Sequence, residues 1–444
     1  MIKGNLAERD GPMKRMTKIL IVSTWLLGVI LLVTGHSFSM ELVFKDLQYS
    51  FQTLRALSYA VSGGADIGEV FKTAYQIKEG DDESWHREWL KIAELREKAG
   101  DEFLARGRKI SARQEFFKAS NYYRTAEFFL HTNPEDPRTV SVWKKSRDSF
   151  LKAAKLADHP IIPVEIPFEG TTLPGYLCLV DRTGTKRPLL IVHSGFDGTV
   201  EEIYYGTAFF AVQRGYNVLL FEGPGQGRVI RVQKIPFRPN WESVLTPVVD
   251  FALGRREVDP KKIALMGISF GGYLAPRAVA FEKRIKACIA NGGVYDFHAA
   301  ARLTPEDEKE LDSPQGAEEF DRFIYEKMKT EPSFRWSMAN GLFTFRAKSP
   351  SEWLKMTRPY TMKDVAGKIT CPMLIVDSEE DKDMPGQAKK LYEALRPPKD
   401  FMLFTKEEGA EEHCQMGALL ISNARILDWL DDLMKKDPAG KPKR

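Results

Sequence analysis

Cysteine is scarce in this sequence, and the placement of the few cysteines excludes several kinds of site. The 444 residues include four cysteines: Cys178, Cys288, Cys371 and Cys414. No two of them form a Cys-x-x-Cys pair, the spacing found in many zinc sites and redox-active dithiols. Most lie in or beside apolar runs, where unpaired cysteines are usually buried. We therefore expect no disulfide framework, no redox motif and no metal site.

A strong charge of either sign is also missing. The formal net charge is +4 at pH 7, which is too small to predict nucleic-acid binding, and no basic stripe with interleaved aromatic residues occurs. Otherwise the composition is that of a globular protein, with 43% hydrophobic and 28% charged residues. The length predicts two or three domains. The Lys- and Arg-rich end predicts a disordered, solvated tail over residues 437–444.

Uncharged apolar segments long enough for a membrane are rare, and the candidate lies near the N-terminus. Residues 19–35 carry no charge and follow Lys14, Arg15 and Lys18. This length is at the short end for a transmembrane helix and near the upper limit for a signal-peptide core, so both interpretations stay open. Because upstream positive charge keeps residues 1–18 in the cytoplasm, we expect the remainder to be extracytoplasmic. The protein would then be membrane-anchored through this segment, or secreted or periplasmic.

From residue 41 to about residue 158 the pattern is helical. Apolar residues recur three and four positions apart, which is the spacing of an amphipathic helix. Gly107 is typical of a helix end, and Ser111 with Gln114 three residues later predicts a capping box at the next helix start. We expect a helical N-terminal domain over residues 41–158.

The pattern changes to short apolar runs at residue 161. Two runs joined at Glu169-Gly170 predict a hairpin. Six more runs alternate with helical stretches: PLLIVH, YNVLLF, KIALMG, IKACIA, PMLIVD and DFMLFT. Continuous apolar strands separated by helices indicate an α/β domain, here residues 161–436, with a mostly parallel sheet covered on both faces. The interval at about 297–360 is too long for a simple connection, and its helical pattern predicts a cap insertion.

A serine between two glycines stands where the third of these six runs gives way to a helical pattern. In KKIALMGISFGGYLAPRAVAF, residues 267–271 read G-x-S-x-G, with Ser269 at the centre. This is the pattern of the nucleophile elbow, a strained strand-to-helix turn that exposes a serine hydroxyl. A side chain at either glycine would collide with the neighbouring strand or helix. An ordinary glycine-rich turn has the same pattern, so the surrounding residues must decide.

A nucleophilic serine needs a histidine base, and His413 occupies the expected position. In folds with this elbow the acid and then the histidine follow the serine, in loops at the carboxyl edge of the sheet. Of seven histidines, His413 alone follows the last predicted strand, just ahead of the closing helix. His193 and His298 could still line the pocket.

The orienting acid should come from the acidic turn after PMLIVD. This turn contains Glu379, Glu380, Asp381 and Asp383, and Asp377 ends the strand before it. Asp381 is the predicted acid, because it falls in the turn from which a carboxylate can reach the imidazole. Glu380 is the alternative, and a solvated acidic loop is the interpretation that assigns no function.

Backbone N–H groups should stabilise the oxyanion. One is expected from Phe270, directly after the nucleophile, and the other from Phe196 or Gly195 in HSGFDG. The stretch FEGPGQG, residues 221–227, superficially suggests a dinucleotide loop. Its spacing is G-x-G-x-G instead of G-x-G-x-x-G, so we expect a structural turn and no organic cofactor.

As a set, the motifs of this chain resemble one family. They include GGADIGEVF, DDESWHREWL, SNYYRTAEFFL, VEIPFEGTTLPGYL, SGFDGTVEE, FEGPGQG, RPNWESVLTPVVDFAL and EEGAEEHCQMGA, besides the elbow. The resemblance is to the α/β-hydrolases with an N-terminal helical domain. That group contains 2,6-dihydroxypseudooxynicotine hydrolase, fungal polyketide chain-shortening hydrolases and proteins described as dipeptidyl aminopeptidase/acylaminoacyl peptidase-like. It implies an α/β-hydrolase fold and a triad of Ser269, Asp381 and His413, and it adds carbon–carbon cleavage next to a ketone as an option.

Three functions are therefore weighed. The first is a serine hydrolase that cleaves an ester, amide or related carbonyl compound through an acyl-enzyme. The second is a C–C hydrolase acting on a β-diketone-like substrate, and the third is an inactive, membrane-tethered binding protein on the same scaffold. The predicted insertion is rich in aromatic residues: Phe320, Phe323, Tyr325, Phe334, Trp336, Phe343 and Phe345. Packing alone would explain them, but we expect some to line a pocket for a bulky, apolar small molecule.

Overall fold

The computed structural model describes residues 42–435. The predicted N-terminal segments, residues 1–18 and 19–35, and the predicted tail, residues 437–444, lie outside the described residues. Along residues 42–435, no helix combines the length and the apolar character needed to cross a bilayer.

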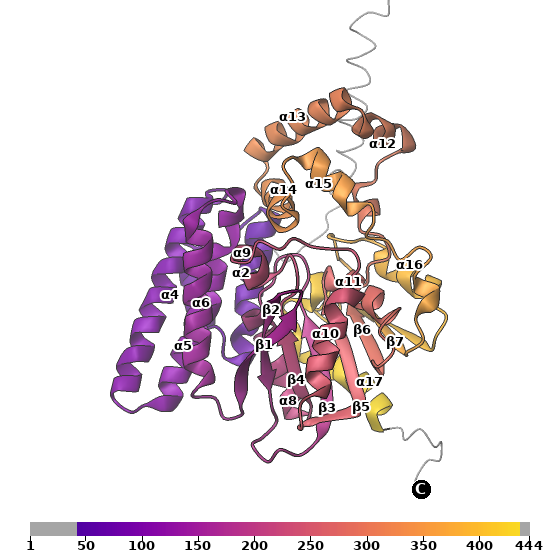
Figure 1. Ribbon diagram of the computed structural model, residues 1–444. Coiled ribbons are helices and arrows are strands. Elements are labelled where there is room, and N and C mark those ends of the chain that lie inside the picture. The colour runs from indigo at the N-terminus through magenta and orange to yellow at the C-terminus, as the bar shows by residue number, and fades with distance from the viewer. Residues whose placement is uncertain (1–41, 436–444) are drawn as a thin grey trace, which may run out of the picture.

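The first third of the described chain is helical (Figure 1). Its elements are α2 (Leu47–Ser58), η3 (Tyr59–Ser62), α3 (Ile67–Ala74), α4 (Asp82–Ala105), α5 (Lys109–Glu127), η4 (Phe128–Thr132) and α6 (Pro137–Ala154). Side chains of Asp46, Asp81 and Asp136 cap α2, α4 and α6 by accepting backbone N–H groups of the first turn. The long helices α4, α5 and α6 lie side by side beside the sheet.

The turn between α4 and α5 agrees with the prediction at its start and differs at its end. Gly107 has φ +72° and donates its N–H to the carbonyl of Leu104, so it ends α4 as predicted. The predicted capping box at Ser111 is wrong, because α5 begins at Lys109 without a side-chain cap. Gly107 already reverses the chain, and the N–H of Ala112 bonds the carbonyl of Arg108 at 2.9 Å. Ser111 therefore lies inside the first turn of α5 and not at its N-cap.

An eight-stranded sheet forms the body of the protein and confirms the predicted fold class. Its strands are β1 (Ile161–Phe168), β2 (Thr171–Cys178), β3 (Arg187–His193), β4 (Asn217–Phe221), β5 (Val258–Ile268), β6 (Ala287–Asn291), β7 (Met373–Ser378) and β8 (Lys399–Phe404). Their spatial order is β1-β2-β4-β3-β5-β6-β7-β8. The β1–β2 hairpin is antiparallel, β2 pairs with β4 antiparallel, and the remaining pairs are parallel. Consequently β5 lies inside the parallel part of the sheet.

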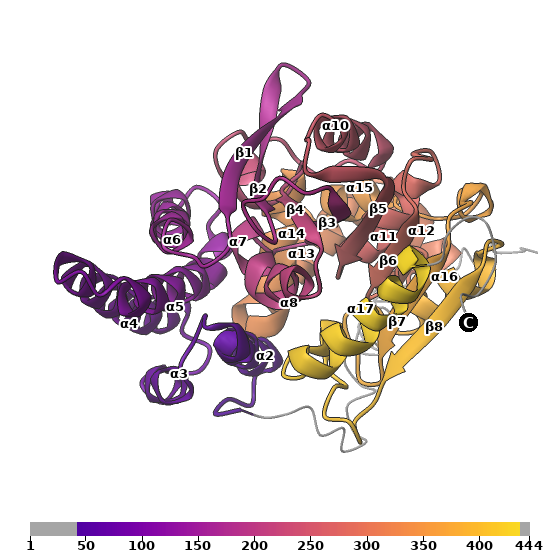
Figure 2. The same ribbon diagram turned by 90° about the horizontal axis from the view of Figure 1, so that it is seen from below.

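Both faces of the sheet are covered, which is why its strands are continuously apolar. In β3, Leu189 and Ile191 join the core on one face, whereas Leu190 and Val192 join the core on the other. The first face packs against α10 (Glu242–Leu253), α11 (Gly271–Val279) and α16 (Gln387–Ala394). The other packs against α8 (Phe209–Gln213), α17 (Leu419–Lys435) and the N-terminal helices. Figure 2 shows α10 and α8 on opposite sides of the sheet.

Four helices between β6 and β7 form a group above the sheet (Figure 1). They are α12 (Pro305–Asp312), α13 (Pro314–Thr330), α14 (Pro332–Phe345) and α15 (Pro350–Thr357), and η6 (His298–Ala301) precedes them. Each begins with proline, which suits the first helical position because that position needs no N–H donor. We call α12–α15 the cap. The shorter elements α7 (Val200–Ile203), η5 (Tyr204–Ala208), α9 (Gly227–Arg231), η7 (Ala366–Lys368) and η8 (His413–Gln415) complete the fold.

Candidate active site

Ser269 occupies a strained turn between β5 and α11. Its φ is +62°, in the left-handed region that costs a residue with a side chain about 1–2 kcal/mol. The backbone is held there by a hydrogen bond of 2.8 Å from the Ser269 N–H to the carbonyl of Asn291, at the end of β6. The turn therefore has the strained geometry of a nucleophile elbow.

The neighbouring glycines are required by close backbone contacts. A Cβ on Gly267 would lie 2.1 Å from the carbonyl oxygen of Gly271, and one on Gly271 would lie 3.0 Å from the carbonyl oxygen of Ser194. Gly272, outside the G-x-S-x-G pattern, is as restricted as Gly267, because its Cβ would lie 2.0 Å from the carbonyl oxygen of Gly292. Substitution at Gly267 or Gly272 would displace the elbow.

His413 connects the serine to a carboxylate. Its Nδ1 lies 2.6 Å from Oδ2 of Asp381, and its Nε2 lies 2.9 Å from Oγ of Ser269. Because an ionised carboxylate only accepts hydrogen bonds, Nδ1 carries the proton and donates to Asp381. In the neutral imidazole, Nε2 then accepts the hydroxyl proton of Ser269. The structure thus brings the three residues singled out from the sequence into one hydrogen-bonded chain.

Asp381 is fixed by its own turn. Its Oδ1 accepts the N–H groups of Asp383 and Met384 at 3.0 and 3.3 Å. Burial raises the pKa of the Asp381 carboxyl, but the charge and hydrogen bond of His413 and these N–H groups outweigh it, so that the pKa is lowered. The carboxylate therefore stays ionised beside the imidazole.

The other acids considered from the sequence do not bond His413. Asp377 accepts the N–H of Ser378 at 3.0 Å, and burial together with the charge of Asp381 raises its pKa to about 6. The N–H of Glu380 donates to the carbonyl of Glu411. Of these acids, Asp381 is the one whose side chain lies at hydrogen-bond distance from Nδ1.

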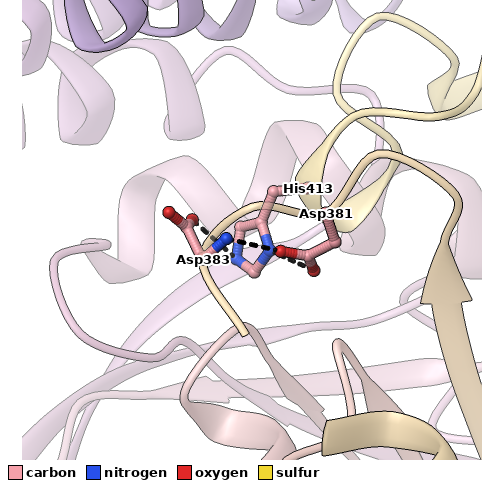
Figure 3. A group of neighbouring side chains, drawn as sticks. All are labelled: Asp381, Asp383 and His413. Carbon is pink, nitrogen blue, oxygen red and sulfur yellow. Dashed lines mark hydrogen bonds and ion pairs between the residues drawn. The ribbon is translucent and has the colours of Figure 1, made fainter. Parts of the chain in front are cut away.

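A second carboxylate faces the other nitrogen of His413. Oδ2 of Asp383 lies 3.6 Å from Nε2, and Figure 3 shows Asp381 and Asp383 on opposite sides of the imidazole ring. These three side chains are also the set in residues 42–435 whose donor atoms are close enough to hold a cation together. Nδ1 of His413 faces Asp381, and Nε2 faces Ser269 and Asp383. The atoms that could bind a cation are therefore directed at one another.

The loop after β3 lies against the elbow. A Cβ on Gly195 would be 2.5 Å from the backbone nitrogen of Phe270 and 2.7 Å from the carbonyl oxygen of Ile268. Within residues 42–435, the backbone N–H groups of Gly195, Phe196 and Phe270 donate no hydrogen bond. Donors at the predicted oxyanion positions are therefore available beside Ser269.

The two histidines predicted as possible pocket residues have different positions. His298 lines the cavity beside Ser269, and its ring nitrogens bond Thr357 at 2.8 Å and Glu308 at 2.5 Å. His193 is fully buried beneath the elbow, where Nδ1 donates to the carbonyl of Ser194 at 2.9 Å. Burial lowers the pKa of His193 to about 4. The prediction is wrong for His193, because the end of β3 turns this side chain into the core.

A cavity of about 300 Å³ opens beside Ser269 and His413. Three parts of the chain line it: helix α2, the loops at the carboxyl edge of the sheet, and the cap with the segment leading to it. Most lining side chains are apolar, among them Phe51, Phe196, Phe297, Phe320, Phe334, Trp336, Met338 and Trp353. The cavity therefore suits an apolar small molecule.

Three of the seven aromatic residues predicted for the pocket line this cavity: Phe320, Phe334 and Trp336. Phe343 and Phe345 are buried in packing contacts, and Tyr325 is 42% exposed. The aromatic content of the cap thus serves both packing and the cavity wall. The sequence indicates that the helical N-terminal domain is long enough to cover this edge of the sheet, but it did not single out α2, because the contribution of α2 depends on how the helical region packs on the sheet.

This geometry was compared with known proteins. Residues 189–407 match the model of the alpha/beta hydrolase family. A hydrolase of a Fusarium species is 33% identical over 411 residues, which cover 88% of this chain and 98% of that protein. The 20-hydroxy-prefusarin hydrolase of Gibberella moniliformis is 32% identical over 410 residues, again 88% of this chain and 98% of the relative. The chain belongs to the α/β-hydrolase family.

The crystal structure of 2,6-dihydroxy-pseudo-oxynicotine hydrolase has the same fold. It superposes with a TM-score of 0.67 at 20% identity, covering 85% of this chain and 96% of that one. The protein is thus an enzyme, a hydrolase of the α/β-hydrolase family. The interpretation as an inactive binding protein is set aside.

In this α/β-hydrolase, buried ion pairs join the helical region to the segment after β3. Arg55 of α2 bonds Asp197 at 2.7 Å and Glu202 at 2.6 Å, and Arg124 of α5 lies 3.2 Å from Glu202. Burial by itself would raise the pKa of the Asp197 carboxyl. The positive charges of Arg55 and Arg124 outweigh the effect of burial, so the pKa is lowered. Asp197 follows Phe196 directly, so these pairs anchor the loop that carries the candidate oxyanion donors. The sequence contained no signal for these contacts, because the paired residues lie far apart in the chain, with Arg55 142 positions from Asp197 and 147 positions from Glu202.

The turn at residues 221–227 supports the same loop. The side chain of Gln226 donates to the carbonyl of Ser194 at 2.6 Å. The carboxylate of Glu222 accepts the N–H groups of Val200 and Arg228 at 2.8 and 2.6 Å. Burial and the charge of Glu201 raise the pKa of Glu222 to about 7. The glycine-rich stretch is therefore a structural turn that holds the loop after β3.

Proposed function

We propose that this enzyme is a serine hydrolase in which Ser269 is the nucleophile, His413 the general base and Asp381 the orienting acid. The observation that carries the proposal is the hydrogen-bonded chain from Asp381 through Nδ1 and Nε2 of His413 to Oγ of Ser269, at the edge of an apolar cavity. Positioned groups of these types activate a serine that is otherwise a weak nucleophile.

The reaction would proceed through an acyl-enzyme. Oγ of Ser269 attacks the substrate carbonyl carbon while its proton moves to Nε2 of His413. The N–H group of Phe270 and that of Phe196 or Gly195 stabilise the negative oxygen. The bond to the leaving group then breaks, and Nε2 gives its proton to the leaving atom. Water, deprotonated by the same nitrogen, attacks the acyl-enzyme and releases the acid and the free serine.

The substrate we propose is a bulky, largely apolar small molecule with an ester, amide or related carbonyl group. A cavity of about 300 Å³ with aromatic walls favours burial of apolar surface, which contributes about 25 cal/mol per Å². The family relationship supports a small-molecule substrate, since one relative is named for hydrolysis of 20-hydroxy-prefusarin.

Labelling with a fluorophosphonate probe tests the nucleophile. We expect stoichiometric labelling of the wild-type protein at Ser269, with loss of ester hydrolysis in proportion. Ser269→Ala should remain unlabelled and lose turnover by about a millionfold. Thr207→Ala serves as a control, because this buried hydroxyl is not part of the chain of hydrogen bonds, and the variant should keep labelling. Labelling at another residue in the wild-type protein would refute the assignment.

Hydrolytic carbon–carbon cleavage of a β-diketone-like substrate is a second candidate. It would use the same residues, with His413 giving its proton to the enolate carbon that leaves. The resemblance of the motifs to hydrolases that include such enzymes favours it. Parallel assays with a 1,3-diketone and with butanoate esters distinguish the two, since a C–C hydrolase should convert the diketone into a ketone and a carboxylic acid.

A further inference from the structure

The cavity contains one acidic side chain that the proposed reaction does not use. Asp383 lies in the turn after β7, lines the cavity and is 51% exposed at its side chain. Within residues 42–435, its carboxylate accepts no hydrogen bond, and its closest charged contact is Nε2 of His413 at 3.6 Å. That distance is longer than a hydrogen bond.

The other charged side chains of the cavity are already paired. Arg55 and Asp197 bond each other at 2.7 Å, and His298 bonds Glu308 at 2.5 Å. Asp383 is thus the charged group of the described cavity wall that has no short partner. The surrounding wall is apolar, with Met384 next in sequence and the Phe51 ring tilted against the His413 ring at 6.4 Å between centroids.

An apolar substrate would remove water from this carboxylate without replacing the lost hydrogen bonds. Desolvating a charged group without a partner is costly, whereas a hydrogen bond to it in a dry site is stronger than in water. A molecule that fills the cavity therefore binds better if it brings a donor to Asp383. A substrate carboxylate at the same place would be repelled.

The position of Asp383 sets where this donor must lie. The leaving atom has to come within about 3 Å of Nε2 to receive its proton. Oδ2 of Asp383 lies 3.6 Å from the same nitrogen. A hydroxyl or amine on the leaving group, a few bonds from the scissile bond, can therefore reach the carboxylate.

We propose that Asp383 is a specificity-determining residue that accepts a hydrogen bond from a hydroxyl or amine on the leaving group of the substrate. The inference rests on the proposed serine-hydrolase function and adds a substrate class to it. The preferred substrate is then an apolar carbonyl compound whose leaving group carries a hydrogen-bond donor next to the scissile bond.

A pair of aryl esters tests the inference. 2-Hydroxyphenyl butanoate has a donor beside the scissile bond, and 2-methoxyphenyl butanoate has similar size without it. The measured quantity is the ratio of the two kcat/KM values, divided by the ratio of the two rates of hydrolysis by hydroxide. For the wild-type enzyme we expect a corrected preference of about 10- to 100-fold for the hydroxyl ester.

The variants assign this preference to one side chain. Asp383→Ala should bring the corrected ratio close to one, and the matched variant Glu380→Ala, from the same turn, should keep the wild-type ratio. Because both esters share His413, a change in the basicity of that residue cancels in the ratio.

Each of the following results would overturn the inference. A wild-type enzyme without preference, or an Asp383→Ala variant that keeps it, shows that Asp383 does not bind the donor. An equal loss for both esters in Asp383→Ala shows that the carboxylate acts through His413. Failure of the wild-type enzyme to hydrolyse either ester, together with absence of fluorophosphonate labelling at Ser269, would instead reject the proposed function and the inference with it.

Discussion

The side-chain amide of Asn340, in cap helix α14, donates a hydrogen bond of 3.0 Å to the carbonyl oxygen of Phe196, in the loop after β3. Its own Oδ1 accepts the Nδ1–H of His131, from the helical region, at 2.8 Å. Asn340 is fully buried. One side chain thus connects the cap, the N-terminal helices and the loop that contains two candidate oxyanion donors.

Asn340→Ala should therefore impair catalysis at a distance from the reacting atoms. Without the amide, the Phe196 peptide is no longer fixed, and the loss of alignment should lower kcat by about 10- to 100-fold with a smaller change in KM. Steady-state kinetics on a small activated ester measure this. Asn423→Ala is the control, since this buried amide bonds the carbonyl groups of Gly206 and Leu419. It should lower the melting temperature but leave kcat largely unchanged, and an equal loss of kcat would contradict the role of Asn340.

Ser269→Gly should be more stable than Ser269→Ala. The φ of +62° is strained for alanine but accessible to glycine, which also has greater freedom in the unfolded chain. We expect a net difference of about 0.5–1 kcal/mol in the free energy of unfolding. Urea denaturation of both inactive variants measures it. If the Ser269→Ala variant is more stable than the Ser269→Gly variant, the elbow is not strained in solution.

Asp381→Asn should lower kcat by about four orders of magnitude on the ester assay. An amide at this position favours the wrong tautomer of the His413 imidazole, so that Nε2 can no longer accept the serine proton. Glu380→Gln and Asp377→Asn are matched isosteric controls from the same segment, and each should cost far less. A comparable loss from either control would transfer the role of the acid to that residue.

The pH dependence of kcat/KM should have an acid limb above the ordinary histidine range. Burial lowers the pKa of His413, but Asp381, Cys414 and Asp383 outweigh it, so that the pKa lies well above 6.5. The base is active only when neutral, and kcat/KM should fall as the pH falls through this raised pKa. The stability that the charged imidazole contributes is complete below pH 6.5 and is lost as the pH rises through the raised value. In Asp383→Asn the acid limb should move to lower pH; an unmoved limb would show that Asp383 does not influence His413.

Phe334→Ala should reduce the preference for large acyl groups. This side chain lines the cavity on α14, so its removal takes away apolar contact that only a bulky substrate makes. The ratio of kcat/KM for a decanoate ester to that for an acetate ester should fall about tenfold. Tyr325→Ala, an exposed cap aromatic outside the cavity wall, should leave the ratio unchanged. An unchanged ratio in Phe334→Ala would show that the cap does not select the substrate.

Much of the fold followed from local patterns. The apolar runs became the strands because alternate side chains fill the two cores on either face of the sheet. Gly107 ended α4 because its positive φ suits glycine. The start of α5 could not be predicted from Ser111, since the preceding turn already supplied the geometry that a cap provides. Likewise, the polarity of His193 did not reveal that it lies beneath the elbow, because burial depends on neighbouring strands and helices.

Two contacts of equal sequence separation show what the sequence determined by itself and what required the tertiary structure. His413 and Ser269 are 144 positions apart, as are Asn340 and Phe196. The first pair was predictable, because parallel strands place their carboxyl ends at one edge of the sheet, and the loops there meet whatever lies between them. The second pair, the position of Asp383 beside Nε2, and the ion pairs of Arg55 depend on how the cap and the helices pack over that edge. No local pattern encodes such packing, because it results from the combined burial of side chains contributed by distant segments.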